Sequence, residues 1–199
     1  MHAARSKGSG RRSRGPVETE PRSSVVAGTP APRAGWPDSI DAPLSGLDLG
    51  DATADRPRLV IEVWMVRPGD EPGPLALLLR RRPEQGGFWQ GVSGRVEMTD
   101  ATLRAAARRE VLEETGFDLP DESFFDLGGW TTFQGLMSGR WFVKRPFGLL
   151  LPGTATAAAV TLSDEHDAAE DLALDAALAR LAFEDNRVLL AAAARRMTG

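Results

Sequence analysis

Residues 109–116 read Arg-Glu-Val-Leu-Glu-Glu-Thr-Gly and are the most informative segment of the sequence about the fold. It ends a run rich in Ala, Leu, Arg and Glu, a composition typical of an α-helix. Gly116 stands where a helix C-cap is expected, and Asp100 or Thr102 can cap the start. The pattern therefore predicts a helix over residues 101–115.

Three glutamates share one face of that helix. Glu110, Glu113 and Glu114 are spaced i, i+3 and i+4, so their side chains fall within an arc of roughly 100°. Like charges at this spacing repel each other, and a hard divalent cation relieves the repulsion because it binds carboxylate oxygens. The alternative is a solvated acidic face on which Arg109 pairs with Glu113 at i, i+4.

A glycine-bearing segment lies just before the helix. Residues 91–97 read Gly-Val-Ser-Gly-Arg-Val-Glu and form the exit of a short strand predicted over residues 89–96. This exit lays its backbone and Glu97 against the carboxylate face of the helix. Glu97 is then a further candidate metal ligand, and the alternative is an ordinary glutamate at a strand end.

The two segments together carry a known pattern. Gly94 is followed by the helix residues Arg109-Glu110-x-x-Glu113-Glu114-x-Gly116-Phe117. This order resembles the Nudix box, whose pattern is Gly, five residues, Glu, seven residues, Arg-Glu, an aliphatic, any residue, Glu-Glu, any residue, Gly, an aliphatic. The first half departs from it: the isolated Glu falls on Asp100 or Ala101, and the interval from Gly94 to Arg109 is one residue longer.

Residues 77–94 resemble the branch of this family that includes dihydroneopterin triphosphate pyrophosphohydrolases. Residues 162–166, Leu-Ser-Asp-Glu-His, are similar to the same branch, as is the later pair Asn186-Arg187. In that branch an aromatic usually follows the Glu-His pair by five residues, whereas Asp171 stands there in this chain. We therefore expect a related fold with a different substrate pocket.

The resemblance implies an α+β fold, with a mixed β-sheet sandwiched between helices. Alternation and strand-forming residues predict the strands, and apolar periodicity predicts the helices that close the chain. The predicted strands cover residues 59–66, 75–79, 89–96, 124–133, 141–151 and 158–162, and the closing helices residues 172–181 and 186–197.

Charge separates a tail from this domain. Five of the 24 Lys and Arg residues lie within positions 1–17, which hold none of the 28 Asp and Glu residues. Residues 1–55 are rich in Gly, Ser, Ala and Pro without helix or strand periodicity, and are predicted to be a disordered tail. A transit peptide and a nucleic-acid-binding arm are alternatives. The Nudix domain is expected at residues 56–199.

The resemblance also implies the chemistry, in which water attacks phosphorus in a nucleoside diphosphate linked to another group. Mg²⁺, with Mn²⁺ as the alternative, would be held by Glu110, Glu113 and Glu114. Glu110 and Glu165 compete for the role of general base, and Glu165 is alternatively a metal ligand. Arg109 is expected to orient a neighbouring carboxylate.

Four further residues are candidates for contacting the substrate. Arg80 and Arg82 follow a predicted strand, and strand alternation lets these two of three consecutive arginines share one side. Their guanidinium groups can bind phosphate in bidentate fashion, and the alternative is a solvated strand end. Gln90 and Gly94 lie within and at the end of the next strand, within reach of phosphate or base.

Composition excludes other chemistries. The 199 residues contain no Cys and only two His, which excludes disulfides, thiol nucleophiles and thiolate zinc sites. With 42% hydrophobic and 26% charged residues and no apolar run of 18, the chain is expected to be a soluble protein without a membrane span. The missing Cys fits a reducing compartment and a cytoplasmic location. The acidic body argues against binding nucleic acid through phosphates.

These observations predict a Mg²⁺-dependent Nudix pyrophosphohydrolase that splits a nucleoside-triphosphate-like substrate into monophosphate and pyrophosphate. Substrates of this kind are deoxynucleotides, nucleotides and dihydroneopterin triphosphate; the alternatives are dinucleoside polyphosphates and nucleoside diphosphate conjugates. A non-catalytic nucleotide-binding module would lose helix carboxylates, and all three are present. An interaction protein with an acidic helix leaves the Gly94 loop and Glu165 unexplained. A homodimer is compatible with the resemblance.

Overall fold

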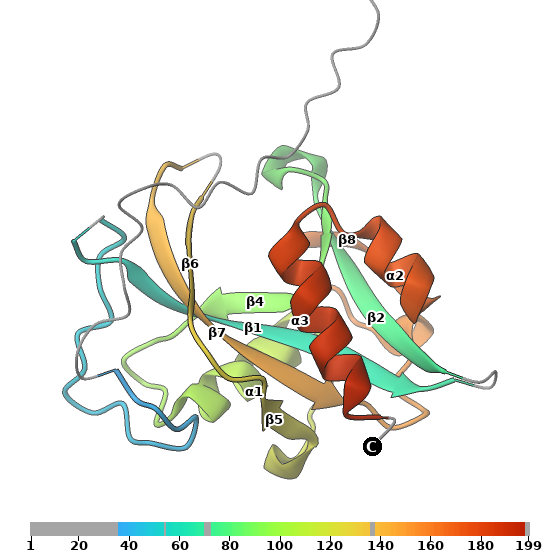
Figure 1. The fold of residues 1–199 in the computed structure, drawn as a ribbon, viewed down its shortest axis with the longest axis horizontal. Coiled ribbons are helices and arrows are strands. Elements are labelled where there is room, and N and C mark those ends of the chain that lie inside the picture. The colour runs from blue at the N-terminus through green and yellow to red at the C-terminus, as the bar shows by residue number, and fades with distance from the viewer. Residues whose placement is uncertain (1–35, 54, 70–72, 136–137, 198–199) are drawn as a thin grey trace, which may run out of the picture.

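The computed structural model describes residues 36–53, 55–69, 73–135 and 138–197. Within them a mixed sheet lies between helices on its two faces (Figure 1). The helices are α1 (Leu103–Thr115), α2 (Leu174–Arg180) and α3 (Glu184–Arg195). The strands are β1 (Arg58–Pro68), β2 (Pro74–Arg81), β3 (Trp89–Gln90), β4 (Val92–Arg95), β5 (Phe124–Asp126), β6 (Thr131–Gln134), β7 (Trp141–Leu150) and β8 (His166–Ala173).

The sheet divides at the central strand, β1. β7 runs parallel along one edge of β1, while β4 and β2 pair antiparallel with it in succession, at Val63↔Val92 and then at Met65↔Leu77. β3 and β8 pair with β2, and β5 and β6 pair with β7. The point where β4 and β2 separate lies beside β3 and the start of β8, where the candidate site is built.

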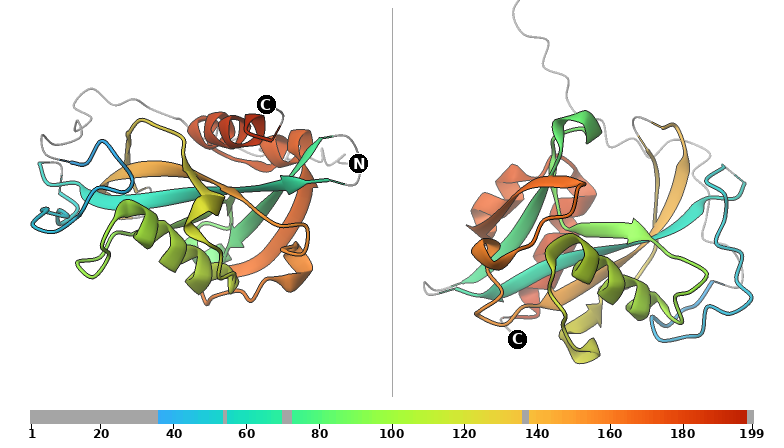
Figure 2. Two further views of the ribbon diagram at one scale, coloured as in Figure 1. Left: turned by 90° about the horizontal axis from the view of Figure 1, so that it is seen from below. Right: turned by 180° about the vertical axis from the view of Figure 1, so that it is seen from behind.

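Alternation along β1 produces two cores. Leu59, Ile61 and Val63 pack on the side of α1, and Trp64 and Val66 pack on the side of α2 and α3. Figure 2 shows α1 against one face of the sheet and the two later helices against the other. The predicted sandwich of a mixed sheet between helices is therefore confirmed.

The central helix has the predicted end and one of the two predicted caps. The Thr102 hydroxyl accepts a 3.0 Å hydrogen bond from the Ala105 backbone N–H, so Thr102 and not Asp100 is the N-cap. Gly116 closes the helix at φ 77°, a left-handed conformation that glycine adopts without strain, and its N–H donates to the Leu112 carbonyl.

Several predicted strands differ from those observed. The predicted strand at residues 158–162 is wrong: Ala157–Ala159 forms a 3₁₀ turn, and the strand is β8. β8 reads His-Asp-Ala-Ala-Glu-Asp-Leu-Ala, whose acids and alanines favour strands poorly, so pairing with β2 rather than local preference makes it a strand. The predicted strand at residues 89–96 is interrupted at Gly91, and the one at residues 124–133 is interrupted between β5 and β6.

Part of the predicted tail belongs to the core. Trp36, Ile40, Leu44 and Leu49 are buried with the residues on the α1 side. Backbone bonds of 3.0 Å join Leu44 N–H to the Ala101 carbonyl and Arg104 N–H to the Ile40 carbonyl. The prediction of a tail without a core is therefore wrong for residues 36–53, whose apolar residues follow an irregular path without helix or strand period. Residues 1–35 lie outside the described residues.

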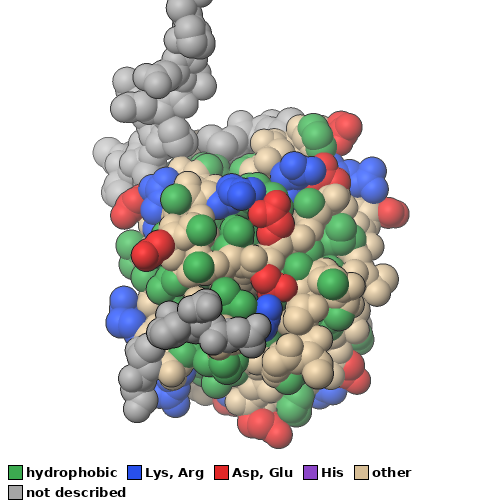
Figure 3. Space-filling model, turned by 90° about the vertical axis from the view of Figure 1, so that its right-hand side faces the viewer, with side chains coloured by type: hydrophobic (Ala, Val, Ile, Leu, Met, Phe, Trp, Pro, Cys, Tyr) green, Lys and Arg blue, Asp and Glu red, His purple; other side chains and the backbone are tan. Residues whose placement is uncertain are grey.

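The described surface mixes charges of both signs. Figure 3 shows acidic and basic side chains interspersed on one face, without an extended patch of one sign. In the part of the chain that the structure describes, no helix has the length and apolar character needed to cross a membrane.

The buried N-terminal segment gives a stability prediction. Leu44 is 5% exposed, so Leu44→Ala is expected to lower the free energy of unfolding by about 2–5 kcal/mol, because it removes a packed side chain from the core. Urea denaturation measures the loss. Ser45→Ala, at an exposed neighbour, is the matched control and is expected to stay within about 0.5 kcal/mol of wild type. Equal stability of the two variants would contradict the packing.

Candidate active site

Two of the three helix glutamates are buried between α1 and β4. Glu110 is 9% exposed and Glu114 4%. Gly94 of β4 faces Glu110 so closely that an added Cβ would lie 1.8 Å from the Glu110 carboxyl carbon. Residue 94 therefore has to be glycine for this carboxylate to keep its position. Gly94 was predicted to contact substrate, and the structure places it against Glu110.

Arg109 joins the carboxylate face to the loop before the helix. Its guanidinium donates to both oxygens of Asp100 at 3.0 and 2.9 Å, to the Arg95 carbonyl at 2.8 Å and to Glu110 Oε1 at 2.8 Å. Glu113 Oε2 lies 3.3 Å away. The bonds to Asp100 raise the pKa of Arg109, which stays a cation. Arg109 thus contacts the neighbouring carboxylate that it was predicted to orient.

The start of β8 brings a second group to the cluster. Glu165 precedes β8, and its Oε2 lies 3.0 Å from Arg81 Nη2. His166 is 2% exposed; its Nδ1 lies 3.7 Å from Glu114 Oε2, and its Nε2 lies 3.4 Å from Gln90 Nε2. The predicted residues Glu110, Glu114, Glu165 and Gln90 therefore meet on the α1 side of the sheet.

The arginines differ from the prediction. Arg80 pairs with Asp167 at 2.7 Å and lies over the Trp89 ring, which belongs to the core on the α2 and α3 side. Arg82 is exposed, 4.0 Å from Asp164. It is Arg81 that meets Glu165, so strand alternation selected the two arginines that lie outside the cluster. Arg81 follows Leu77 and Leu79, which pack on the α1 side, so regular alternation along β2 brings Arg81 to that side, and the prediction failed in choosing which side of the strand faces the cluster. The register shift itself falls in β8, where Asp167 is the extra residue.

Two other candidate ligands lie at the rim. Glu113 has a side chain 57% exposed and is held only by Arg109. Glu97 is exposed, and its backbone N–H donates to Asp100 Oδ2 at 2.8 Å. The structure therefore brings Glu113 to the edge of the carboxylate cluster but does not bring the Glu97 side chain against the helix face.

Burial and mutual repulsion control the charge of the cluster. Burial, followed by the charges of Glu110 and Glu165, raises the pKa of Glu114 to about 9. Burial also raises the pKa of Glu110, against the opposing effect of Arg109. Burial and the nearby Arg81 lower the pKa of His166 to about 4, so its imidazole is neutral. Glu114 is therefore the carboxyl group whose burial the positive charges of the chain compensate least.

The donor set fits a divalent cation. Glu114 Oε2 is buried without a hydrogen-bond partner, although a buried carboxylate oxygen is costly to leave unbonded. Within the described residues, no three Asp, Glu or His side chains converge as they stand to hold a metal ion. Glu110 and Glu113 are bonded to Arg109 and Glu165 to Arg81, so the carboxylates have to reorient to share a cation.

A family model describing the Nudix domain matches residues 56–193. The chain belongs to the Nudix hydrolase family. Hydrolases of this family act on phosphoric acid anhydrides and generally use divalent metals.

Solved Nudix structures share the fold. Dihydroneopterin triphosphate pyrophosphohydrolase from E. coli is 26% identical, covers 69% of this chain and 95% of its own, and superposes with a TM-score of 0.57. The NUDIX domain of Shewanella oneidensis NrtR, complexed with ADP ribose, is 18% identical with a TM-score of 0.58, and covers 72% of this chain and 90% of its own. A C. elegans Ap4A hydrolase is 19% identical with a TM-score of 0.53, and the match covers 71% of this chain and 98% of that one.

A curated relative matches by sequence. An octanoyltransferase from Myxococcus xanthus is 36% identical over 139 residues, which make up 67% of this chain but 36% of that protein. The chain thus spans little more than a third of that relative's length. The relative's activity is a property of a longer protein.

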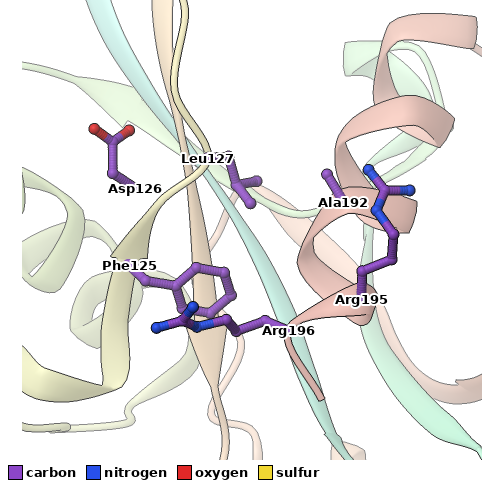
Figure 4. A pocket seen from close by; sticks show the side chains of 6 residues that line it. All are labelled: Phe125, Asp126, Leu127, Ala192, Arg195 and Arg196. Carbon is purple, nitrogen blue, oxygen red and sulfur yellow. The ribbon is translucent and has the colours of Figure 1, made fainter. Parts of the chain in front are cut away.

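A surface pocket lies away from the Nudix carboxylates. A pocket of about 540 Å³ is lined by residues of β5, of the loop after it and of the C-terminal part of α3. Figure 4 shows the Arg196 guanidinium beside the Phe125 ring, at 5.9 Å. No carboxylate of α1 lines this pocket, and the residues that match the Nudix box, Glu110 and Glu114, lie in the cluster on the α1 side, which is therefore the candidate active site.

The raised pKa of Glu114 gives a pH prediction. A carboxyl group whose folded pKa lies near 9 favours folding below its ordinary pKa and loses that contribution as pH rises through the folded value. In a chelator, wild type is therefore expected to lose at least about 1 kcal/mol more stability than Glu114→Gln between about pH 6 and pH 9. Denaturation at several pH values measures this. Parallel stability curves would show that Glu114 is not buried in this way.

Proposed function

We propose that this Nudix hydrolase is Mg²⁺-dependent, with Mn²⁺ as the alternative, and splits a nucleoside-triphosphate-like substrate into monophosphate and pyrophosphate. One observation carries the proposal: Glu110 and Glu114 are buried together, and one oxygen of Glu114 has no partner. A cation binding there would offset the burial and the repulsion that raise the pKa of both groups.

Glu110, Glu113 and Glu114 would hold the metal. Glu110 and Glu114 would supply oxygens from the buried side, and the exposed Glu113 would supply one from the rim. Glu97 is the outermost candidate ligand, on a loop that Asp100 anchors. When bound, the cation neutralises charge on the substrate phosphates and lowers the pKa of a bound water.

Glu165 is the stronger candidate for the general base. Glu110 is buried and bonded to Arg109, which restrains it from accepting a proton from a moving water. The Glu165 side chain is 53% exposed and belongs to a loop, yet its charge is felt by both Glu110 and Glu114. Arg81, the partner of Glu165, would then be free to bind a substrate phosphate once Glu165 moves.

The substrate class rests on similarity. The E. coli dihydroneopterin triphosphate pyrophosphohydrolase matches over 95% of its length, which supports a triphosphate bearing a heterocycle. Asp171, at the place of the branch's usual aromatic, bonds Arg67 Nε at 3.1 Å and the Ala157 N–H at 2.7 Å. Asp171 therefore stabilises the local structure, and an aromatic stacking partner at this position is missing. Dinucleoside polyphosphates are the second candidate, supported by the fold shared with the Ap4A hydrolase.

A substrate panel tests the proposal. Wild type with Mg²⁺ or Mn²⁺ is expected to release pyrophosphate from at least one of dihydroneopterin triphosphate, deoxynucleotides and nucleotides, with products identified by mass spectrometry. Glu110→Gln and Glu114→Gln are each expected to lower kcat/KM by roughly 100-fold or more, because charge stabilisation at the phosphates is lost. Glu122→Gln, an exposed glutamate away from α1, is the control. Wild-type activity in both Glu110→Gln and Glu114→Gln would overturn the assignment.

Alanine substitutions at Gly94 and Gly91 are expected to affect activity and stability differently. Gly94→Ala is expected to keep the fold, because the side chain of Glu110 can move aside, and to lower kcat/KM by roughly 10–100-fold. Gly91→Ala places its Cβ 2.3 Å from the Val63 carbonyl oxygen, which cannot move, so stability falls by about 1–3 kcal/mol. Thermal denaturation and initial rates measured on both variants show the difference. A Gly94→Ala protein with wild-type activity would contradict the placement of Glu110.

A further inference from the structure

Two buried polar atoms face each other without partners on the α1 side of the sheet. They are Glu114 Oε2 and His166 Nδ1, which lie 3.7 Å apart on side chains that are 5% and 0% exposed. A buried polar atom without a hydrogen bond destabilises the folded protein. A small shift of either side chain lets Nδ1 donate to one lone pair of Oε2, and a carboxylate oxygen has a second lone pair with which to bind a cation.

Gln90 determines which ring nitrogen of His166 carries the proton. The Gln90 amide nitrogen lies 3.4 Å from His166 Nε2 and 3.4 Å from Ser93 Oγ. An amide nitrogen only donates, so Nε2 accepts and the proton of the neutral ring sits on Nδ1. That N–H is the one directed at Glu114, so the donors and acceptors run in one direction from Gln90 to the carboxylate.

The backbone fixes both members of this chain. Gln90 pairs with Leu79 and His166 pairs with Arg81, so both are attached to the end of β2. Gln90 is 7% exposed and His166 2%, which restricts their rotamers. The Ser93 backbone also bonds to Glu114. The carboxylate is therefore approached by fixed groups from β4 and β8.

We propose that Gln90 and His166 are positioning residues that hold the Glu114 carboxylate in the orientation in which it takes a divalent cation. This rests on the metal site of the proposed function and extends it to two residues that bind neither metal nor substrate. Gln90, predicted to contact substrate, acts instead through His166. Partners of this kind orient metal-binding side chains, and their loss typically lowers metal affinity 10–100-fold.

Mn²⁺ binding to the full-length, substrate-free protein tests the inference, with free Mn²⁺ measured by electron paramagnetic resonance. His166→Leu removes the donor and is expected to weaken Mn²⁺ binding roughly 10–100-fold. His166→Asn places an amide N–H near the position of Nδ1 and is expected to recover most of the affinity. Gln90→Leu leaves the ring without its partner and is expected to fall between them. Asp167→Asn, at the next residue and paired with Arg80 outside the cluster, is the matched control.

The outcomes are distinguishable. If wild type and Glu114→Gln bind Mn²⁺ equally, the proposed metal site itself fails. If Glu114→Gln weakens binding but His166→Leu and Gln90→Leu match wild type, the metal site stands and the positioning role is overturned. If His166 only stabilises the fold, His166→Leu lowers the melting temperature in chelator and leaves the Mn²⁺ affinity unchanged, which also overturns the positioning role. If His166→Leu does not fold, the other two variants decide. Weaker Mn²⁺ binding by Gln90→Leu together with near-normal binding by His166→Asn supports the inference. Wild-type Mn²⁺ affinity in both of these variants overturns it.

Discussion

The constraint on which the rest of the structure depends is the burial of two carboxyl groups, Glu110 and Glu114, in one layer between α1 and the sheet. Two such groups repel each other when ionised, and burial raises the pKa of both. Two neighbouring residues make the burial of Glu110 possible. Gly94 leaves room for one carboxylate, and Arg109 bonds it while fixing the preceding loop through Asp100.

The position of α1 depends on contacts made by distant parts of the chain. Arg104, in its first turn, bonds both oxygens of Asp41 and the carbonyls of Asp121 and Phe124. Because the helix is rigid, a restraint at its first turn also limits how Glu110 and Glu114 can move at its other end. The N-terminal segment from Trp36 therefore contributes to the site without approaching it.

Sequence patterns predicted the parts of this site that depend on local spacing. The helix, its cap at Gly116 and the shared face of its glutamates all follow from the 3.6-residue period. Parts that depend on pairing between distant segments could not be predicted that way. Arg81 follows Leu77 and Leu79 on the α1 side and meets Glu165 only because β8 pairs with β2, and the same pairing makes a strand of β8 despite its composition. The burial of residues 36–53 has no period to reveal it.

The other face of the sheet shows how the chain treats a buried charge that needs no ligand. Lys144 lies 2.8 Å from Glu62, 3.0 Å from Asp185 and 3.3 Å from the Asn186 side-chain oxygen, and the indole N–H of Trp64 donates to Glu62. Every charge there has its counterpart within the chain, which is how buried ion pairs are retained. The same domain leaves Glu114 Oε2 and His166 Nδ1 unbonded on the α1 side. Glu62 thus has a lysine of the chain as its partner, whereas the buried oxygen of Glu114 has none among the described residues, which is the arrangement expected of a carboxylate that binds a ligand from outside the chain.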